Sequence, residues 1–306
     1  MINNSFFSTE ILRWFRENGR DLPWRETRDP YAIWLSEIIL QQTRIAQGWE
    51  YWERFVQTYP KVEDLAAASE DDVLKLWQGL GYYSRARNLH TAAKQIVALG
   101  DFPNTLEGIK SLKGVGDYTA AAIGSFAFDI PAAVVDGNVY RVLSRYFGID
   151  TPINSTQGKK EFAALAQSLL PASDAASYNQ GMMDFGAIQC TPQSPKCLLC
   201  PLAETCEALR CGRVEELPVK NKTVKVKTRH LSYIYIRCKS SAADGTGKSE
   251  PMVAIHRRGE GDIWQGLWEP YNVSDVKELP SFVKNPILLA KDVKHVLTHR
   301  ILLADF

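Results

Sequence analysis

Four cysteines fall within seventeen residues, at Cys190, Cys197, Cys200 and Cys206. Prolines between them favour turns, so the four thiolates can converge on one tetrahedral centre. Two kinds of site need such a set: a structural zinc ion and a four-iron cluster. A disulfide framework is disfavoured, because we expect no signal peptide and only two further cysteines are present, Cys211 and Cys238. Spacing alone leaves zinc and the cluster open.

Glu37 is a carboxylic acid in an otherwise apolar helical segment, Trp34–Thr43. Isoleucine and leucine residues flank it on both sides, which favours a buried position over a solvent-facing one. Burial disfavours the charged form and raises the pKa of a carboxyl group. Glu37 is therefore predicted to keep a proton near neutral pH, as a general acid requires.

A Gly-x-Gly turn, Gly114-Val115-Gly116, joins two predicted helices. Glycines let the backbone approach another chain closely, and the following helix offers free N–H groups at its N-terminus. Such a turn binds a phosphate without reading the base. A lone Gly-x-Gly is also compatible with a tight turn that needs only small residues. The neighbouring Leu112 and Thr119 complete a helix-hairpin-helix pattern, which favours DNA binding.

Asp136 stands where another helix is predicted to begin. An aspartate there caps the helix by accepting hydrogen bonds from its first N–H groups, and the same bonds favour the ionised carboxylate. An ionised carboxylate stabilises a cationic sugar in a transition state. Together with a protonated Glu37, it would form the pair of carboxyl groups that breaks a glycosidic bond.

The first two-thirds of the chain is predicted to be all-helical. Ser8 is expected to cap the first helix, and Asp29-Pro30 to begin a second with apolar residues recurring from Ile33 to Ile45. Further helices are expected over residues 62–68, 70–78, 84–98, 105–111, 118–127, 137–147, 158–169 and 178–187. This region, residues 1–212, is expected to hold the chemistry.

The pattern changes after Gly212. Residues 213–229 are polar and basic without helical periodicity, which predicts a linker. Two strand-like runs follow, Leu231–Cys238 and Pro251–His256, and they predict a hairpin that opens an α+β domain. This second domain, residues 230–306, ends in a strand-like run, so we expect it to be trimmed or unusually small.

Bulk composition excludes a membrane protein but selects no partner. The chain has 306 residues and a formal net charge of +1, and no apolar run approaches the ~20 residues that span a bilayer. A near-neutral total can still hide a basic face. Basic residues gather at Lys220, Lys222, Lys225, Lys227 and Arg229, and others flank the hairpin and Asp136: Lys110, Lys113, Arg141 and Arg145.

These motifs together resemble the helix-hairpin-helix DNA glycosylases, in which a hairpin, an aspartate and a [4Fe–4S] loop follow in this order. Further segments narrow the resemblance to the MutY family of adenine DNA glycosylases: Leu22–Arg25, Trp34–Thr43, Gly79–Arg85 and Trp264–Glu269. The family implies a mainly α fold with a six-helix subdomain (about 26–132), a cluster subdomain (about 1–25 with 133–212) and a C-terminal α+β Nudix-like domain.

The resemblance also implies roles for single residues. Glu37 would protonate adenine N7, and Asp136 would stabilise the oxocarbenium-like sugar with support from Tyr118 and Asn138. The four cysteines would hold the [4Fe–4S] cluster. The adenine pocket would comprise Leu22, Trp24, Arg25, Ile45 and Gln180. DNA would be contacted by Gln42, Thr43, Leu80, Gly81, Tyr82, Gly114, Val115 and Gly116, and 8-oxoguanine by Leu297, Thr298 and His299.

Tyr118 separates two reaction classes. Bifunctional relatives carry a lysine at this hairpin position, whose amine forms a Schiff base and cuts the strand. A phenol cannot do so, which predicts simple hydrolysis of the base. The second domain lacks the glutamate-rich Mg²⁺ helix of Nudix hydrolases, so it is expected to recognise a lesion and not to hydrolyse a nucleotide.

The implied partner is double-stranded DNA with adenine opposite 8-oxoguanine or guanine, bound by a monomer in the cytoplasm of a bacterium, at the nucleoid. Two alternatives remain. One is a glycosylase of the same fold that removes thymine or an oxidised pyrimidine. The other is a non-catalytic DNA-binding module with a zinc knuckle, in which Glu37 and Asp136 have no purpose.

Overall fold

The computed structural model describes residues 4–221, 226–239, 251–273, 287–297 and 300–306. The chain divides into two compact units, a helical one of Met1–Gly81 with Arg85–Asn221 and a second one of Tyr82–Ser84 with Lys222–Phe306. No helix among the described residues is both long and apolar enough to cross a membrane.

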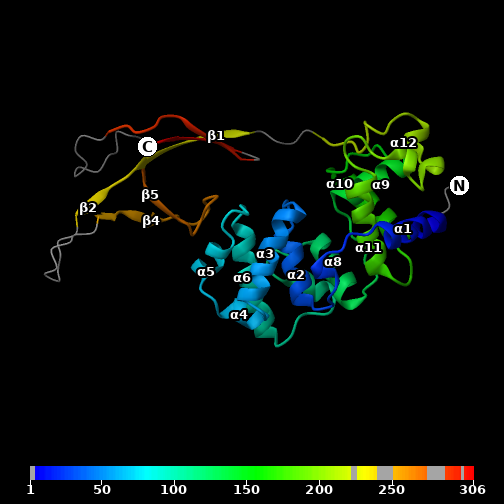
Figure 1. Ribbon diagram of the computed structural model, residues 1–306, viewed down its shortest axis with the longest axis horizontal. Helices are drawn as coiled ribbons and strands as arrows, with labels where there is room; N and C mark the ends of the chain where they lie inside the picture. The colour runs from blue at the N-terminus through cyan, green and yellow to red at the C-terminus, as the bar shows by residue number, and fades with distance from the viewer. Residues whose placement is uncertain (1–3, 222–225, 240–250, 274–286, 298–299) are drawn as a thin grey trace. The chain divides into compact units, whose positions relative to one another are not determined.

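The helical unit consists of α-helices joined by turns and longer loops (Figure 1). Its α-helices are α1 (Asn4–Asn18), α2 (Pro30–Ile39), α3 (Ile45–Thr58), α4 (Val62–Ala67), α5 (Glu70–Leu76), α6 (Ser84–Leu99), α7 (Leu106–Ser111), α8 (Asp117–Phe128), α9 (Gly137–Phe147), α10 (Thr156–Leu169), α11 (Ala175–Asp184) and α12 (Glu207–Arg210). Shorter turns are the 3-10 segments η1 (Pro23–Arg25), η3 (Cys197–Leu199) and η4 (Ala203–Thr205), and the π-helical turn η2 (Phe185–Gln189).

Side-chain caps fix where several of these helices begin. Asp29 accepts a hydrogen bond from Tyr31 N at 3.0 Å and Pro30 opens α2, as its sequence predicts. Ser155 and Thr105 cap α10 and α7 in the same way. Ser8 does not cap α1, which begins at Asn4. Its hydroxyl lies inside the helix and donates to the carbonyl of Leu169 at 2.6 Å, because that position faces α10.

The helices form two packed groups. In one, α2 packs against α3 and α8, and α7 against α8. In the other, α1 packs against α11 and α10, and α9 against α11 and α12, around a core that includes Phe7, Ile11, Val142, Phe162 and Phe185. Contacts between α8 and α11 join the groups. The first helix, α1, packs in the group that contains α9 and the cysteines.

Two features of this unit differ from the sequence prediction. The apolar pattern through Ile45 was expected to belong to one helix, whereas α2 ends at Ile39 and a separate helix, α3, starts at Ile45. The expected linker 213–229 is partly docked: Leu217 O accepts from Arg145 Nε at 3.0 Å, Val219 O accepts from Ile153 N at 3.0 Å, and the helical unit extends to Asn221.

The second unit is built on strands: β1 (Lys227–Ile234), β2 (Arg237–Lys239), β3 (Pro251–Val253), β4 (Ile255–Arg257), β5 (Trp268–Val273), β6 (Val293–Val296) and β7 (Arg300–Asp305). Five form a sheet in the order β4-β5-β1-β7-β6, in which β1 is parallel to β7 and antiparallel to β5. The expected hairpin exists as β2 paired with β3. The two predicted runs are each broken into two strands, and β1 starts before Leu231.

Candidate functional site

Glu37 lies on the second half of α2 and its exposed fraction is only 7%. Its helix neighbours Ser36 and Ile38 are buried as well, as the apolar sequence predicts. Burial raises the pKa of Glu37 to about 7, while a hydrogen bond from Tyr118 lowers it, the charge of Asp136 raises it and that of Arg25 lowers it. At neutral pH this acid is therefore present in both protonated and ionised forms, as a proton donor requires.

Tyr118 sits in the first turn of α8, directly after the glycine hairpin. Its hydroxyl donates to Glu37 Oε2 at 2.8 Å. Burial, together with the charges of Glu37 and Asp136, raises the pKa of Tyr118 well above its ordinary value, so the phenol keeps its proton. The residue holds the acid in place and offers no amine for a Schiff base.

Asp136 caps α9 as predicted. Its Oδ1 accepts hydrogen bonds from the backbone N–H groups of Asn138 and Val139, each at 2.8 Å, and its Oδ2 accepts one from Asn138 Nδ2 at 2.7 Å. These bonds favour the ionised carboxylate, as expected, but burial acts against it. Burial raises the pKa of Asp136 above its usual value, and the bonds from Val139 and Asn138 offset that only in part.

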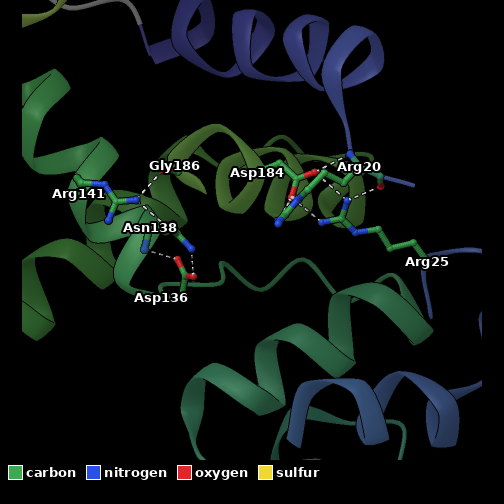
Figure 2. Close-up of polar contacts among 7 residues, drawn as sticks. All are labelled: Arg20, Arg25, Asp136, Asn138, Arg141, Asp184 and Gly186. Atoms are coloured by element: carbon green, nitrogen blue, oxygen red, sulfur yellow. Dashed lines mark hydrogen bonds and ion pairs between the residues drawn. The ribbon is translucent and has the colours of Figure 1, made fainter. Parts of the chain in front are cut away.

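Arg141 connects Asn138, which bonds Asp136, to the carbonyl of Gly186 (Figure 2), and it also reaches the first residue of the cysteine loop. Its Nη2 donates to Asn138 Oδ1 at 2.8 Å and to the carbonyl of Gly186 at 2.6 Å, while its Nε donates to the carbonyl of Cys190 at 2.8 Å. Arg145, one helical turn later, donates to Cys190 Sγ at 3.4 Å. Both arginines are buried, so neither is the solvated surface charge that is the ordinary role of such residues.

The four predicted ligands, Cys190, Cys197, Cys200 and Cys206, line one small cavity and none is in a disulfide. Burial raises the pKa of Cys197, Cys200 and Cys206, that of Cys200 to about 12, and the charge of Cys190 raises all three further, so Cys190 lies within electrostatic reach of the other three. As placed among the described residues, no group of three or more His, Cys, Asp or Glu side chains could hold a single metal ion. The donor set nevertheless fits iron, because four thiols share one hollow and Arg145 supplies an N–H to sulfur.

The residues expected to form a base pocket lie on three elements. Leu22 and Trp24, at η1, are buried, and Trp24 packs edge-on against Trp52 with ring centroids 5.7 Å apart, which is typical of a core aromatic residue. Ile45 begins α3, and Gln180 is half-buried on α11. Arg25 ends η1 and its guanidinium pairs with Asp184.

Gln42, expected to enter the duplex, and Leu80 and Tyr82, expected beside the opposing base, lie on two turns. Gln42 and Tyr82 are exposed and have positive φ angles of 58° and 46°. Leu80 is buried, so it contributes to packing as well. Arg85 ties both turns together, donating to the carbonyl of Ile38 at 3.1 Å at the end of α2, and to that of Leu80 at 3.3 Å.

The hairpin glycines have different structural needs. Gly114 has a φ of +80°, and a Cβ there would lie 2.7 Å from Asn88 Cβ, so the turn itself requires glycine. Gly116 has extended backbone angles, and a Cβ there would meet nothing within 4 Å. The small residue at Gly116 is therefore not required by the packing of this chain, which leaves room for an approaching ligand.

Of the expected lesion-recognition residues, Thr298 and His299 lie outside the described residues. Leu297 N donates to the carbonyl of Arg300 at 2.8 Å, which closes the connection from β6 to β7. The Leu297 side chain packs against the small core of Leu231, Leu302 and Ala304. Leu297 therefore follows the last residue of β6 and helps to cover the core of the sheet.

Sequence reasoning gave Arg141 no role in the site and missed Asp184 altogether. Both signals were present in the sequence as charged residues on helices with apolar neighbours, where a charge needs a partner. Arg141 has a local partner in Asn138, but the Gly186 carbonyl lies 45 residues from Arg141 and Arg20 lies 164 residues from Asp184, so these distant partners could not be read from local patterns.

Comparison with known proteins agrees with this geometry. Residues 35–171 match the family described as HhH-GPD superfamily base excision DNA repair protein, and residues 190–206 match the iron-sulfur binding domain of endonuclease III. The adenine DNA glycosylase of Buchnera aphidicola subsp. Acyrthosiphon pisum is 39% identical over 265 residues, covering 86% of this chain and 73% of that protein. The adenine DNA glycosylase of Mus musculus is 42% identical over 226 residues, covering 69% of this chain and 44% of the mouse protein.

Solved structures show the same helical fold. A thermostable thymine-DNA glycosylase is 34% identical with a TM-score of 0.64, covering 68% of this chain and 97% of that one. A trapped endonuclease III–DNA covalent intermediate is 23% identical with a TM-score of 0.60, covering 69% of this chain and 99% of that one. The second likeness concerns the fold alone.

Proposed function

Because the chain belongs to the adenine DNA glycosylase family, we propose that it hydrolyses the N-glycosidic bond of adenine mispaired with 8-oxoguanine or guanine, and leaves the strand uncut. It is a DNA glycosylase of base excision repair with an iron–sulfur loop. The observation that carries the finer proposal is the buried Glu37, whose pKa of about 7 suits a proton donor and which is held by Tyr118.

In the proposed reaction Glu37 gives its proton to N7 of a flipped adenine. The C1′–N9 bond then breaks, its electron pair leaves with the neutral base, and positive charge develops on the sugar. Asp136 is close enough to raise the pKa of Glu37, so its carboxylate is positioned to stabilise that charge. Water adds at C1′ and releases a proton, which leaves an abasic site. Retaining-glycosidase geometry, with carboxyl groups roughly 5–5.5 Å apart, would favour a covalent intermediate.

Tyr118 cannot supply the amine that strand cleavage needs. A lyase step needs an amine that attacks C1′ and forms an imine. Tyr118 occupies the first turn of the hairpin helix, and its phenol is already used as a hydrogen-bond donor to Glu37. A simple hydrolysis is therefore the reaction that this residue supports.

DNA would be held by the hairpin and by the loop of residues 190–206. Gly116 has open space where a side chain would stand, and α8 starts there with free N–H groups. Cys190, Cys197, Cys200 and Cys206 would hold the [4Fe–4S] cluster, which when bound orders this loop and supplies no electron to the hydrolysis. Lys196 is exposed on the loop and could meet a phosphate.

A second activity, removal of thymine from a guanine mismatch, has one observation in its favour, the 34% identity to a thymine-DNA glycosylase. A single assay separates the two. The iron-loaded chain is incubated with duplexes that contain A·8-oxoguanine, A·G or T·G, and released base is measured with and without alkali treatment. Release of adenine, together with strand breaks that appear only after alkali treatment, supports the proposal. Thymine release alone, or nicking without alkali, would overturn it.

A further inference from the structure

Asp184 is a fully buried carboxylate at the end of α11, and two arginines surround it (Figure 2). Arg25 donates to it with both terminal nitrogens, each at 2.8 Å, in a two-point pair. Arg20 donates through its backbone N–H and its Nε, each at 2.9 Å, and through Nη2. Although burial acts against the charge, the bonds from Arg25 and Arg20 hold the pKa of Asp184 below its usual value.

The pairing fixes the orientation of Arg25 tightly. Its Nη1 also donates to the carbonyl of Arg20 at 2.9 Å, and its guanidinium lies over the Phe15 ring, 5.6 Å from the centroid. A guanidinium has five N–H donors, and among the described residues three of Arg25's are used in these bonds. Two donors therefore remain for a ligand, on a side chain that is 13% exposed.

Arg25 also acts electrostatically on Glu37, the proposed acid. Its positive charge is one of the influences that lower the pKa of Glu37, so the guanidinium and the carboxyl group share one electrostatic environment. Asp184 stands directly before the π-helical turn Phe185–Gln189, whose Gly186 carbonyl accepts from Arg141. Such turns are rare and recur at functional sites. The same short segment thus borders Arg25 on one side and the Asp136 network on the other.

We propose that Asp184 is a positioning residue for base excision: it acts through Arg25, by holding that guanidinium in the one orientation that presents its free N–H donors beside Glu37. The inference rests on the proposed function, since it assumes that a base binds next to Glu37. Bidentate pairing is what sets the orientation, because a second hydrogen bond removes rotation about the first. A purely structural role for Asp184 would instead require only that its charge be neutralised.

A double-mutant cycle tests the proposal. Single-turnover excision rates at saturating enzyme are measured for the iron-loaded wild type, Asp184→Asn, Arg25→Gln and the double variant. We expect Asp184→Asn to lower the rate on the order of 10- to 100-fold, as for a small misplacement in an active site, with little change in DNA affinity. In the Arg25→Gln background the same substitution should lower it by less than about threefold, because the residue through which it acts is already gone.

Arg20→Gln is the matched control, since it removes the other arginine side chain that pairs with Asp184, while the backbone N–H bond of residue 20 and the pair with Arg25 remain. It should keep the rate within about threefold of wild type even if it lowers the melting temperature. Equal losses of excision rate in Arg20→Gln and Asp184→Asn would overturn the proposal. So would a loss of rate from Asp184→Asn that is equal in the wild-type and Arg25→Gln backgrounds.

A further variant serves if Asp184→Asn does not fold. Arg25→Lys keeps the charge and loses the two-point pair, so we expect it to be as slow as Arg25→Gln. A rate near that of wild type in Arg25→Lys would show that orientation is unimportant and would overturn the proposal. If the wild type itself released no adenine, the proposed function would fail; additive effects in an active enzyme would refute only the role of Asp184.

Discussion

The Tyr118 hydroxyl donates a 2.8 Å hydrogen bond to Oε2 of Glu37, and the helices that carry the two residues, α8 and α2, pack directly against each other. One oxygen of the acid is thereby held. Within the described part of the chain no hydrogen bond reaches Oε1, so this is the oxygen available to a base. The hairpin helix that would bind DNA backbone thus also orients the acid.

Glu37→Gln should abolish adenine release and keep binding to the mispaired duplex, because the amide has nearly the same shape and no proton to give. Single-turnover base release and a gel-shift titration measure the two properties. Glu63→Gln, an exposed residue in the first turn of α4, serves as the control and should excise normally. Excision at a wild-type rate by Glu37→Gln would exclude it as the acid.

The excision rate should fall as pH rises through about 7, since only the protonated form of Glu37 can donate and burial places its pKa there. Well above that pH the loss approaches tenfold per pH unit. The bond from Tyr118 lowers this pKa, so Tyr118→Phe should move the falling limb to higher pH. A pH–rate profile of both proteins checks this, with exposed Tyr235→Phe as control; a limb that moves to lower pH would contradict the assignment.

Tyr118→Lys should introduce strand nicking, because it places an amine where bifunctional relatives carry theirs. Borohydride should then trap a covalent protein–DNA species that the parent enzyme does not form, visible as a shifted band on a denaturing gel. Comparable trapping in the parent would mean that another lysine acts as nucleophile and that the enzyme is bifunctional.

Gly186→Ala should destabilise the helical unit by about 1–3 kcal/mol, because the added Cβ would lie 2.5 Å from Asn138 Cβ and 2.9 Å from its carbonyl oxygen. To relieve this clash Asn138 would move away from Asp136, and excision would be slower as a result. Urea unfolding followed by helix ellipticity measures the first effect. Gly137→Ala is the stability control, since a Cβ at Gly137 would meet nothing within 4 Å. Equal stability of the two variants would contradict the expected clash.

Thr298→Ala should narrow the preference for adenine opposite 8-oxoguanine over adenine opposite guanine, while the rate on A·G stays unchanged. The expectation comes from the sequence: a hydroxyl there can bond the extra N–H of the lesion, and loss of one such contact costs about 1–3 kcal/mol. The ratio of excision rates on the two duplexes measures it. An unchanged ratio of rates would indicate that Gln42, Leu80 or Tyr82 recognises the lesion in place of Thr298.

Local chemistry in the sequence predicted much of this site. Glu37 could be placed because its neighbours are apolar, and Asp136 because an aspartate before a helix has a known geometry. Tertiary partners could not be predicted in the same way. The pairing of Arg25 with Asp184 spans 159 residues, and the net pKa of Asp136 depends on burial that only the folded chain creates. The start of α3 was missed because the apolar residues of α2 continue in phase to Ile45.

The return of α1 to the far end of the helical unit has a consequence for how the chain acquires its structure. Phe7 and Ile11 pack in a core completed by Met182 and Phe185, and Ser8 bonds Leu169 across 161 positions. During synthesis the first helix therefore emerges long before its partners do. The helices α2 to α8 contact one another within one continuous stretch of the chain, so this group can assemble first. Packing α1 against α10 and α11 then requires a slow contact between residues far apart in the chain. We therefore expect α2 to α8 to fold before α1 and the C-terminal helices pack together.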